Sequence, residues 1–212
     1  MKRFAFLCIV ACSLQFCETH RINTTEWTSL FDGKSLNGWK VGKNSGTFTV
    51  KNGAIVTQGE MAHLFYDGNI QGHDFKNFEF RAKVMTTPGS NSGIFFHTKY
   101  QDGGRVKKGY EVQINNSHKD SSRTGSLYGV EDIKEVLVND NEWFTVYIMV
   151  KGKHVIVKLN ERTVTDYTEP ENIQRSGRMA QTIISHGMFA LQGHDPNSTV
   201  YFKDIWVKPL PG

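Results

Sequence analysis

Gly109-Tyr110-Glu111-Val112-Gln113-Ile114-Asn115 alternates apolar and polar side chains. This period of two is typical of a β-strand that buries one face, here the face of Tyr110, Val112 and Ile114. The other face carries a carboxyl group and two amides in a row, which favours the floor of a polar cleft that binds a hydroxyl-rich ligand. An ordinary sheet face in contact with water is the alternative that this stretch alone leaves open.

Short alternating runs separated by turn residues also occupy the rest of the chain. Residues 47–50 and 54–57 flank Asn52-Gly53, which is a strong hairpin signal. Residues 115–135 are polar and lack a helical period, so we expect a long loop of the kind that is often functional. Roughly ten to twelve strands with almost no helix predict an all-β fold, an antiparallel β-sandwich or jelly roll.

The amino terminus has the pattern of an export signal. Lys2 and Arg3 precede an apolar run, residues 4–11, that is too short to span a bilayer. Ile9-Val10-Ala11-Cys12 also fits a bacterial lipobox, in which Cys12 would carry a lipid anchor. We expect a signal peptide over 1–17, of plain or lipoprotein type, a linker over 18–26 and a single domain over 27–212. The protein is then exported, and is periplasmic or anchored to the outer membrane.

Cysteine placement and charge exclude several classes of function. Cys8, Cys12 and Cys17 all lie in the leader, so the expected domain has no disulfide and no thiolate nucleophile. Without Lys2 and Arg3, 23 basic and 21 acidic residues remain, and they form no basic run of the nucleic-acid-binding type. The remaining histidines show no metal-ligand spacing. We therefore predict no nucleic-acid partner, no metal site and no cofactor, and leave a divalent cation open.

Two further expected strands carry polar groups on one face. Phe95 and His97 share a face after the entry Asn91-Ser92-Gly93, where the glycine permits close approach of a ligand or a neighbouring backbone. Gln192 and His194 share a face in the run 187–195. If these strands lie beside the Glu111 strand in one sheet, their polar groups converge on one cleft. The alternatives are that His194 belongs to a loop, that His97 is a satisfied sheet histidine and that Asn91-Ser92-Gly93 forms an ordinary turn.

Several motifs in this order resemble one known family. They are Trp27-Thr28-Ser29-Leu30-Phe31-Asp32-Gly33-Lys34, Asn91-Ser92-Gly93-Ile94, Gly109 to Ile114, Thr124-Gly125-Ser126-Leu127-Tyr128-Gly129, Glu142-Trp143 and Leu191-Gln192-Gly193-His194. The chain from Trp27 to Leu210 resembles the 3-keto-disaccharide hydrolase family, formerly DUF1080. The resemblance implies a concanavalin A-like jelly roll and an exported bacterial enzyme acting on glycosides whose sugar carries a ketone at C3. The family commonly has an aspartate where Asn115 stands, so this chain lacks one carboxylate there.

The implied chemistry needs a base, an acid and donors to a developing enolate. A C3 ketone acidifies the proton on C2, and a base that removes it can expel the leaving group from C1, after which water adds. We assign Glu111 as the base and His194 as the acid or the enolate donor, with the reverse assignment open. The residues expected to orient the sugar are Asn91, His97, Gln113, Tyr128 and Gln192.

Three other functions remain open at this stage. A retaining glycosidase would need a second carboxylate about 5–5.5 Å away, which Glu131, Asp132 or Glu135 could supply from the long loop. A non-catalytic carbohydrate-binding or laminin-G-like module would bind the sugar without turnover. A purely structural envelope protein would explain the sandwich and leave the Glu/Gln/His cleft unexplained. In the first two cases the partner is a carbohydrate, and the sequence does not fix the oligomeric state.

Overall fold

The structure, a computed structural model, describes residues 25–212. The expected signal peptide, the lipobox at Cys12 and most of the expected linker lie outside these residues and stay predictions. Within residues 25–212, no helix is long and apolar enough to cross a membrane.

Thirteen strands and three short 3-10 helices make up the described chain. The strands are β1 (Thr28–Ser29), β2 (Trp39–Val41), β3 (Phe48–Lys51), β4 (Ala54–Thr57), β5 (Ala62–Tyr66), β6 (Phe78–Thr86), β7 (Ser92–Thr98), β8 (Tyr110–Ile114), β9 (Phe144–Lys151), β10 (His154–Leu159), β11 (Arg162–Thr168), β12 (Met188–Gly193) and β13 (Val200–Pro209). The 3-10 helices are η1 (Ser45–Thr47), η2 (Gln71–His73) and η3 (Gly177–Met179). The predicted hairpin at Asn52-Gly53 joins β3 to β4.

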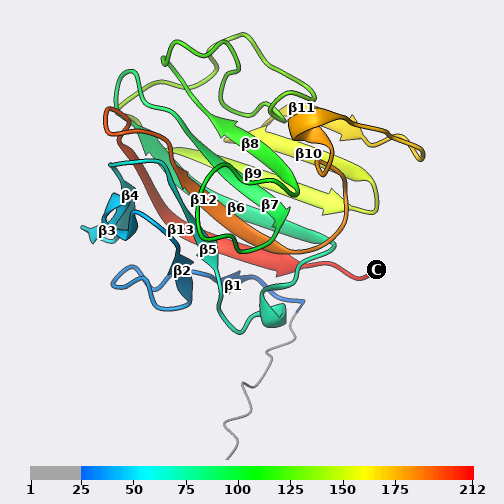
Figure 1. Cartoon of the computed structure of the whole chain (residues 1–212), viewed down its shortest axis with the longest axis horizontal. Helices are drawn as coiled ribbons and strands as arrows, with labels where there is room; N and C mark the ends of the chain where they lie inside the picture. Colours follow the sequence, from blue (N-terminus) through cyan, green and yellow to red (C-terminus); the bar gives the residue numbers. More distant parts are fainter. Residues whose placement is uncertain (1–24) are drawn as a thin grey trace, which may run out of the picture.

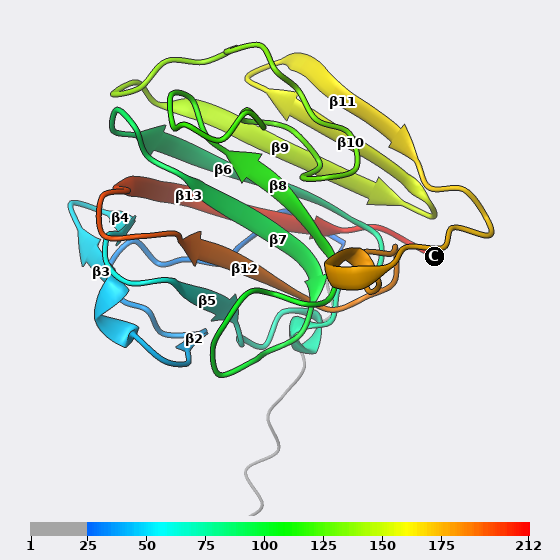
Figure 2. The ribbon, with the colours of Figure 1, turned by 45° about the horizontal axis from the view of Figure 1, so that its top comes forward.

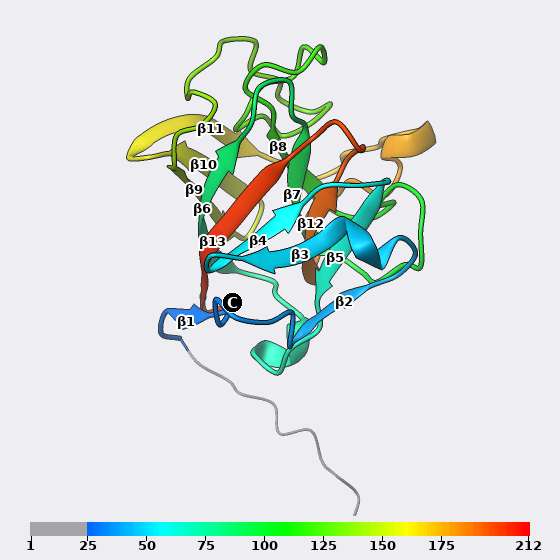
Figure 3. The same ribbon diagram turned by 90° about the vertical axis from the view of Figure 1, so that its left-hand side faces the viewer.

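Two antiparallel sheets face each other. The larger has the order β11-β10-β9-β6-β13-β4-β3, with β1 also paired to β13, and the smaller has the order β2-β5-β12-β7-β8. Figure 1 looks through the smaller sheet onto the larger one, and Figure 3 turns the molecule so that the two sheets lie on opposite sides. The predicted antiparallel β-sandwich of the jelly-roll type is confirmed.

The core fills the space between the sheets. Alternate residues of β6 and β9 point into it, and Tyr110, Val112 and Ile114 of β8 do so from the smaller sheet, as their period of two predicts. Phe189 of β12 joins the two layers, because its ring centroid lies 4.7 Å from that of Phe78 and 4.8 Å from that of Phe80. The outward face of the smaller sheet is therefore left to the alternate residues of β5, β7, β8 and β12.

His97 departs from this alternation, and the expectation that it shares a face with Phe95 is wrong. Its φ of 56° marks a bulge, and the pairing of β7 with β12 shifts at the same place. The bulge directs the imidazole inward, toward the core, where it packs against Phe78 and Phe96. Gly109 and Gly187 have positive φ and crowd the His97 backbone, so neither has room for a side chain.

Both nitrogens of the His97 ring are used in the fold. Nε2 lies 2.8 Å from the Lys76 carbonyl oxygen and donates to it, since Nδ1 accepts the Ser185 backbone N–H at 3.1 Å. Burial lowers the pKa of this imidazole to about 4, so the ring is neutral and holds one tautomer at neutral pH. His97 is thus a structural residue that joins two loops to the sandwich.

A substitution at His97 tests this structural role. Phenylalanine fills a similar volume but forms neither hydrogen bond, and it leaves the Lys76 carbonyl and the Ser185 N–H without these partners. We expect His97→Phe to lower the free energy of unfolding by about 2–4 kcal/mol, measured by urea denaturation. His154→Phe, which removes a half-exposed ion pair with Asp166, is the control and should cost less than about 1 kcal/mol. Equal losses in the two variants would contradict the role.

Candidate active site

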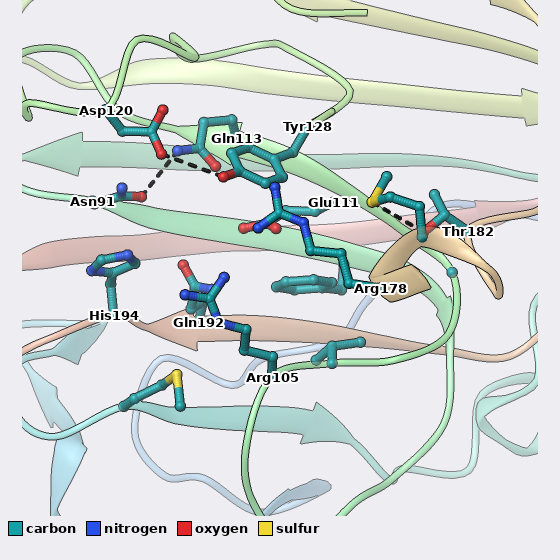
Figure 4. A pocket seen from close by; sticks show the side chains of 15 residues that line it. Asn91, Arg105, Glu111, Gln113, Asp120, Tyr128, Arg178, Thr182, Gln192 and His194 are labelled. Atoms are coloured by element: carbon teal, nitrogen blue, oxygen red, sulfur yellow. Dashed lines mark hydrogen bonds between the residues drawn. The ribbon is translucent and has the colours of Figure 1, made fainter. Parts of the chain in front are cut away.

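Figure 2 shows β5, β12, β7 and β8 of the smaller sheet side by side. A pocket opens on the outer face of this sheet, where β7, β8 and β12 form the floor (Figure 4). Loops from three separate parts of the chain form its walls: 99–109, 115–135 and 176–182. The lining residues are Met61, Asn91, Phe95, Arg105, Val106, Gly109, Glu111, Gln113, Asp120, Tyr128, Arg178, Met179, Thr182, Gln192 and His194.

Glu111 lies at the centre of the floor, and its side chain crosses over the neighbouring strand β7. A Cβ atom at Gly93 would lie only 2.9 Å from Glu111 Cγ, so the glycine makes room for this carboxyl group. The close approach that Gly93 permits is therefore to the side chain of Glu111, whose carboxyl group lies close to the surface of the sheet.

The pKa of Glu111 is raised to about 8. Burial is the main cause, because it disfavours the ionised carboxylate; the Arg105 charge opposes the shift, Asp120 adds to it, and Arg178 opposes it. At neutral pH, Glu111 is therefore mainly a protonated acid that can donate a hydrogen bond or a proton.

A chain of side-chain amides runs from Glu111's strand to the rim. Gln113 is buried and donates from Nε2 to Asn91 Oδ1 at 3.1 Å, and Asn91 Nδ2 in turn lies 3.2 Å from His118 Nδ1. Ser198 fixes the backbone of Asn91 by accepting its N–H at 2.9 Å. These contacts hold both amides at the pocket in set orientations.

His194 is oriented by its neighbour in sequence. Its Nδ1 lies 2.6 Å from Asp195 Oδ2, and because an ionised carboxylate only accepts, Nδ1 must carry the proton. Although burial opposes the shift, hydrogen bonds from His194, the Asn197 N–H and Ser198 lower the pKa of Asp195 and keep it ionised. In the neutral form of the ring, Nε2 of His194 is the nitrogen that can accept a proton, and this residue lines the pocket, the arrangement of a general base with an orienting carboxylate.

Two polar atoms beneath this end of the pocket are buried without a hydrogen-bond partner among residues 25–212. They are Nε2 of His63 on β5 and Oε1 of Gln192, which is its cross-strand partner on β12. Burial and then the charge of His194 lower the pKa of His63 to about 4, so this ring is neutral. Buried polar groups are normally paired, and Gln192 lines the pocket whereas His63 does not, so Gln192 Oε1 is the atom suited to accept a hydrogen bond from a ligand's hydroxyl group.

Asn115 does not continue the polar floor, because it comes after the end of β8 and is fully buried. Its Nδ2 donates to the carbonyl oxygens of Asp120 and Ser122, and its Oδ1 accepts the His118 N–H at 2.8 Å. These bonds close the turn that brings the Asp120 side chain to the pocket, where its Oδ2 lies 3.5 Å from the Tyr128 hydroxyl. The second carboxyl group of the pocket is therefore Asp120, while Glu131, Asp132 and Glu135 do not line it.

Histidine and aspartate side chains also cluster at the rim. His118, His194 and Asp195 offer ligand atoms that all lie within 4.8 Å of one another, although His118 is far in the sequence from the other two. Hydrogen bonds occupy one nitrogen of each ring, since His118 Nδ1 accepts the Asp120 N–H at 3.1 Å and His194 Nδ1 donates to Asp195. These hydrogen bonds fix the tautomer of both histidines.

Of the seven residues predicted for the site, the structure brings six to this pocket: Asn91, Glu111, Gln113, Tyr128, Gln192 and His194. His97 lies in the core instead. The sequence analysis missed Arg105, Asp120 and Arg178, which come from loops without periodicity, and only the polar character of 115–135 pointed to one of them. It also gave no role to Asp195.

The raised pKa of Glu111 makes a prediction about stability. The folded protein keeps this proton up to about pH 8, whereas the unfolded chain loses it near pH 4.5. Between these values the folded state binds more protons, so the free energy of unfolding falls as the pH rises. We expect Glu111→Gln to be more stable than the wild type by roughly 1–3 kcal/mol at pH 8.5, allowing for partial solvent access, and about equal to it at pH 4.5. Chemical denaturation at both pH values measures this, with Glu131→Gln on the exposed loop as a control that should show no such difference.

Comparison with known proteins places the chain in a family. Residues 26–208 match the family described as the 3-keto-alpha-glucoside-1,2-lyase-like domain. A curated 3-keto-disaccharide hydrolase of Bacteroides thetaiotaomicron is 30% identical in an alignment 173 positions long that covers 69% of this chain. The chain spans 60% of the length of that relative.

Two solved structures share the fold. A candidate glycosyl hydrolase from Parabacteroides distasonis superposes with a TM-score of 0.70 at 23% identity, covering 87% of this chain and 94% of that one. The carbohydrate-binding module CBM66 from Bacillus subtilis superposes with a TM-score of 0.54 at 12% identity, covering 81% and 95%. The family match extends over nearly the whole described chain and agrees with the motifs in the sequence, and this chain belongs to the family of 3-keto-alpha-glucoside-1,2-lyase-like domains.

Proposed function

We propose that this protein cleaves glycosides whose sugar carries a ketone at C3, by removing the C2 proton and releasing the leaving group from C1. The observation that carries the proposal is the pairing, in one pocket, of a protonated carboxyl group with an oriented imidazole. Glu111 supplies the first and the His194–Asp195 pair the second. The family to which the chain belongs supports the same chemistry.

The two groups suit the two proton transfers of the elimination, removal of the C2 proton and protonation of the leaving oxygen. His194 Nε2 accepts the C2 proton as the C2–H bond breaks, and the electron pair delocalises onto the C3 oxygen to give an enolate. Collapse of the enolate restores the C3 carbonyl, forms the C1=C2 double bond and breaks the C1–O bond, and Glu111 gives its proton to the departing oxygen. This reverses the assignment that the sequence favoured, and its support is the raised pKa of Glu111 together with the proton on His194 Nδ1.

The remaining polar residues are suited to hold the sugar. Gln113 and Asn91 are fixed by their mutual hydrogen bond, and Gln192 presents a buried oxygen without a partner. Phe95 offers an apolar ring surface between them on β7. A floor of amides beside one aromatic ring is typical of sites that bind hydroxyl-rich ligands.

The names given to the related proteins differ in whether water is added. The family description names a lyase, whereas the curated relative is named a hydrolase. The elimination is common to both outcomes, because water that adds to C1 of the enone gives the free 3-keto sugar. Identifying the product as the enone or its hydrate separates these two outcomes.

Release of a chromogenic leaving group tests the proposal. With a 4-nitrophenyl 3-keto-glucoside we expect turnover by the wild type, and none with the 4-nitrophenyl glucoside that lacks the ketone. Asp195→Asn should lower kcat by about 10²-fold or more with little change in KM, because an amide that accepts poorly no longer fixes the His194 tautomer. Glu131→Gln, outside the pocket, should keep wild-type turnover.

Other results would count against this proposal in distinct ways. Equal release from both glucosides would indicate ordinary glycosidase catalysis with Asp120 as the second carboxyl group. Sugar binding without release from either substrate would favour a carbohydrate-binding module.

The pH dependence of kcat/KM decides which residue is the acid. If Glu111 must be protonated, kcat/KM falls as the pH rises through about 8, because the pKa of the free enzyme governs this parameter. If Glu111 is the base, kcat/KM rises over the same range. Glu111→Gln should remove this limb of the profile in either case, whereas Glu131→Gln should leave it in place.

A further inference from the structure

Two guanidinium groups reach into the pocket from opposite loops. Arg105 belongs to the loop between β7 and β8, and Arg178 to η3 between β11 and β12. In Figure 4 both side chains extend over the floor toward Glu111. None of the ion pairs among residues 25–212 includes either arginine, so both charges face the pocket without a carboxylate partner.

The backbone of Arg105 and the side chain of Arg178 each have a contact that positions them. Gln101 folds the first loop around its own side chain, because its Nε2 donates to the carbonyl oxygen of Arg105 at 2.7 Å and its Oε1 accepts the Lys107 N–H at 3.2 Å. Arg178 lies with its guanidinium carbon 5.8 Å from the centre of the Tyr128 ring, within the range of a cation–π contact. The two loops are also joined, since the Gly109 N–H donates to the Gln181 carbonyl at 3.0 Å.

The positive charges of Arg105 and Arg178 are not balanced by negative charges of the pocket. Glu111 is mainly protonated at neutral pH and so does not neutralise the arginines. Asp120 supplies the other carboxyl group of the lining, at the opposite rim (Figure 4). Its carboxylate accepts hydrogen bonds from the Ser122 N–H at 2.9 Å and from the Tyr128 hydroxyl. A neutral sugar would leave both exposed guanidinium groups at the mouth of the pocket without an anionic partner.

We propose that Arg105 and Arg178 form a subsite for an anionic group, so that the preferred substrates are acidic glycosides with a carboxylate or sulfate on the sugar or its leaving group. Guanidinium groups match both anions through paired N–H donors. This inference rests on the proposed function for the reaction, while the anion subsite can be tested by binding alone.

Titration calorimetry with unreactive sugars tests the subsite directly. We expect glucuronate and glucose 6-sulfate to bind at least tenfold more tightly than glucose at low salt, because charge-assisted hydrogen bonds add to the shared hydroxyl contacts. The preference should shrink as the ionic strength rises. A stronger response to one of the two anions identifies the carboxylate or the sulfate as the natural group.

Variants of the loops provide the matched controls. Arg105→Gln combined with Arg178→Gln should abolish the preference and leave glucose binding within about twofold of the wild type. Lys107→Gln removes a positive charge from the same loop but outside the pocket lining, and should keep the preference. Both arginines are exposed, so these variants should fold, which their melting temperatures check.

The results separate this inference from the proposed function. Equal binding of acidic and neutral sugars, or no binding of any of them, would overturn the anion subsite even if 3-keto-glycosides are cleaved. A double variant that loses glucose as strongly as glucuronate would overturn it too, since the arginines would then serve the neutral ring. Acidic sugars that bind with the expected preference, with no cleavage of any 3-keto-glycoside, would leave the subsite in place and reject the reaction.

Discussion

The enclosure of one carboxyl group in the face of a β-sheet is the constraint on which the site depends. Glu111 lies across β7 because Gly93 has no side chain, and none of the ion pairs among residues 25–212 includes its carboxyl group. The protein holds it as an acid with a pKa near 8, at a cost in stability that grows with pH. Natural proteins commonly accept such a cost at the position where chemistry takes place.

The strands of the sandwich form the floor of the pocket, and the loops form its walls. Floor residues such as Glu111 and Gln192 stand on strands whose opposite faces are packed in the core, and Phe189 ties those strands to the larger sheet. Wall residues such as Arg105 and Arg178 stand on loops that the core does not specify. The floor therefore fixes the positions of the Glu111 carboxyl group and the amides, whereas the positions of the wall residues depend on the paths of the loops.

The sequence predicted the floor better than the walls, for a physical reason. A period of two determines which side chains of β8 face outward, so the alternation alone assigns Glu111 and Gln113 to one surface. The same rule failed at His97, because a bulge adds one residue and reverses the facing of the side chains after it. It failed again at Asn115, where the strand had already ended. Asp120 and the two arginines depend on loop paths, which have no period to read, and the His194–Asp195 contact depends on a side-chain geometry that adjacency in sequence does not determine.

The loop that carries Asp120 has no regular secondary structure, yet its polar groups are extensively paired by Asn115, Asn116 and Thr124. The conformational entropy of this segment is therefore lost when the protein folds, and not when a ligand arrives. A ligand that contacts this wall meets a surface already in its bound shape. Little of the free energy of binding is therefore lost to ordering the loop. Preorganisation of this kind predicts fast association with small structural change, a behaviour usually expected of rigid helices and strands and here provided by a loop.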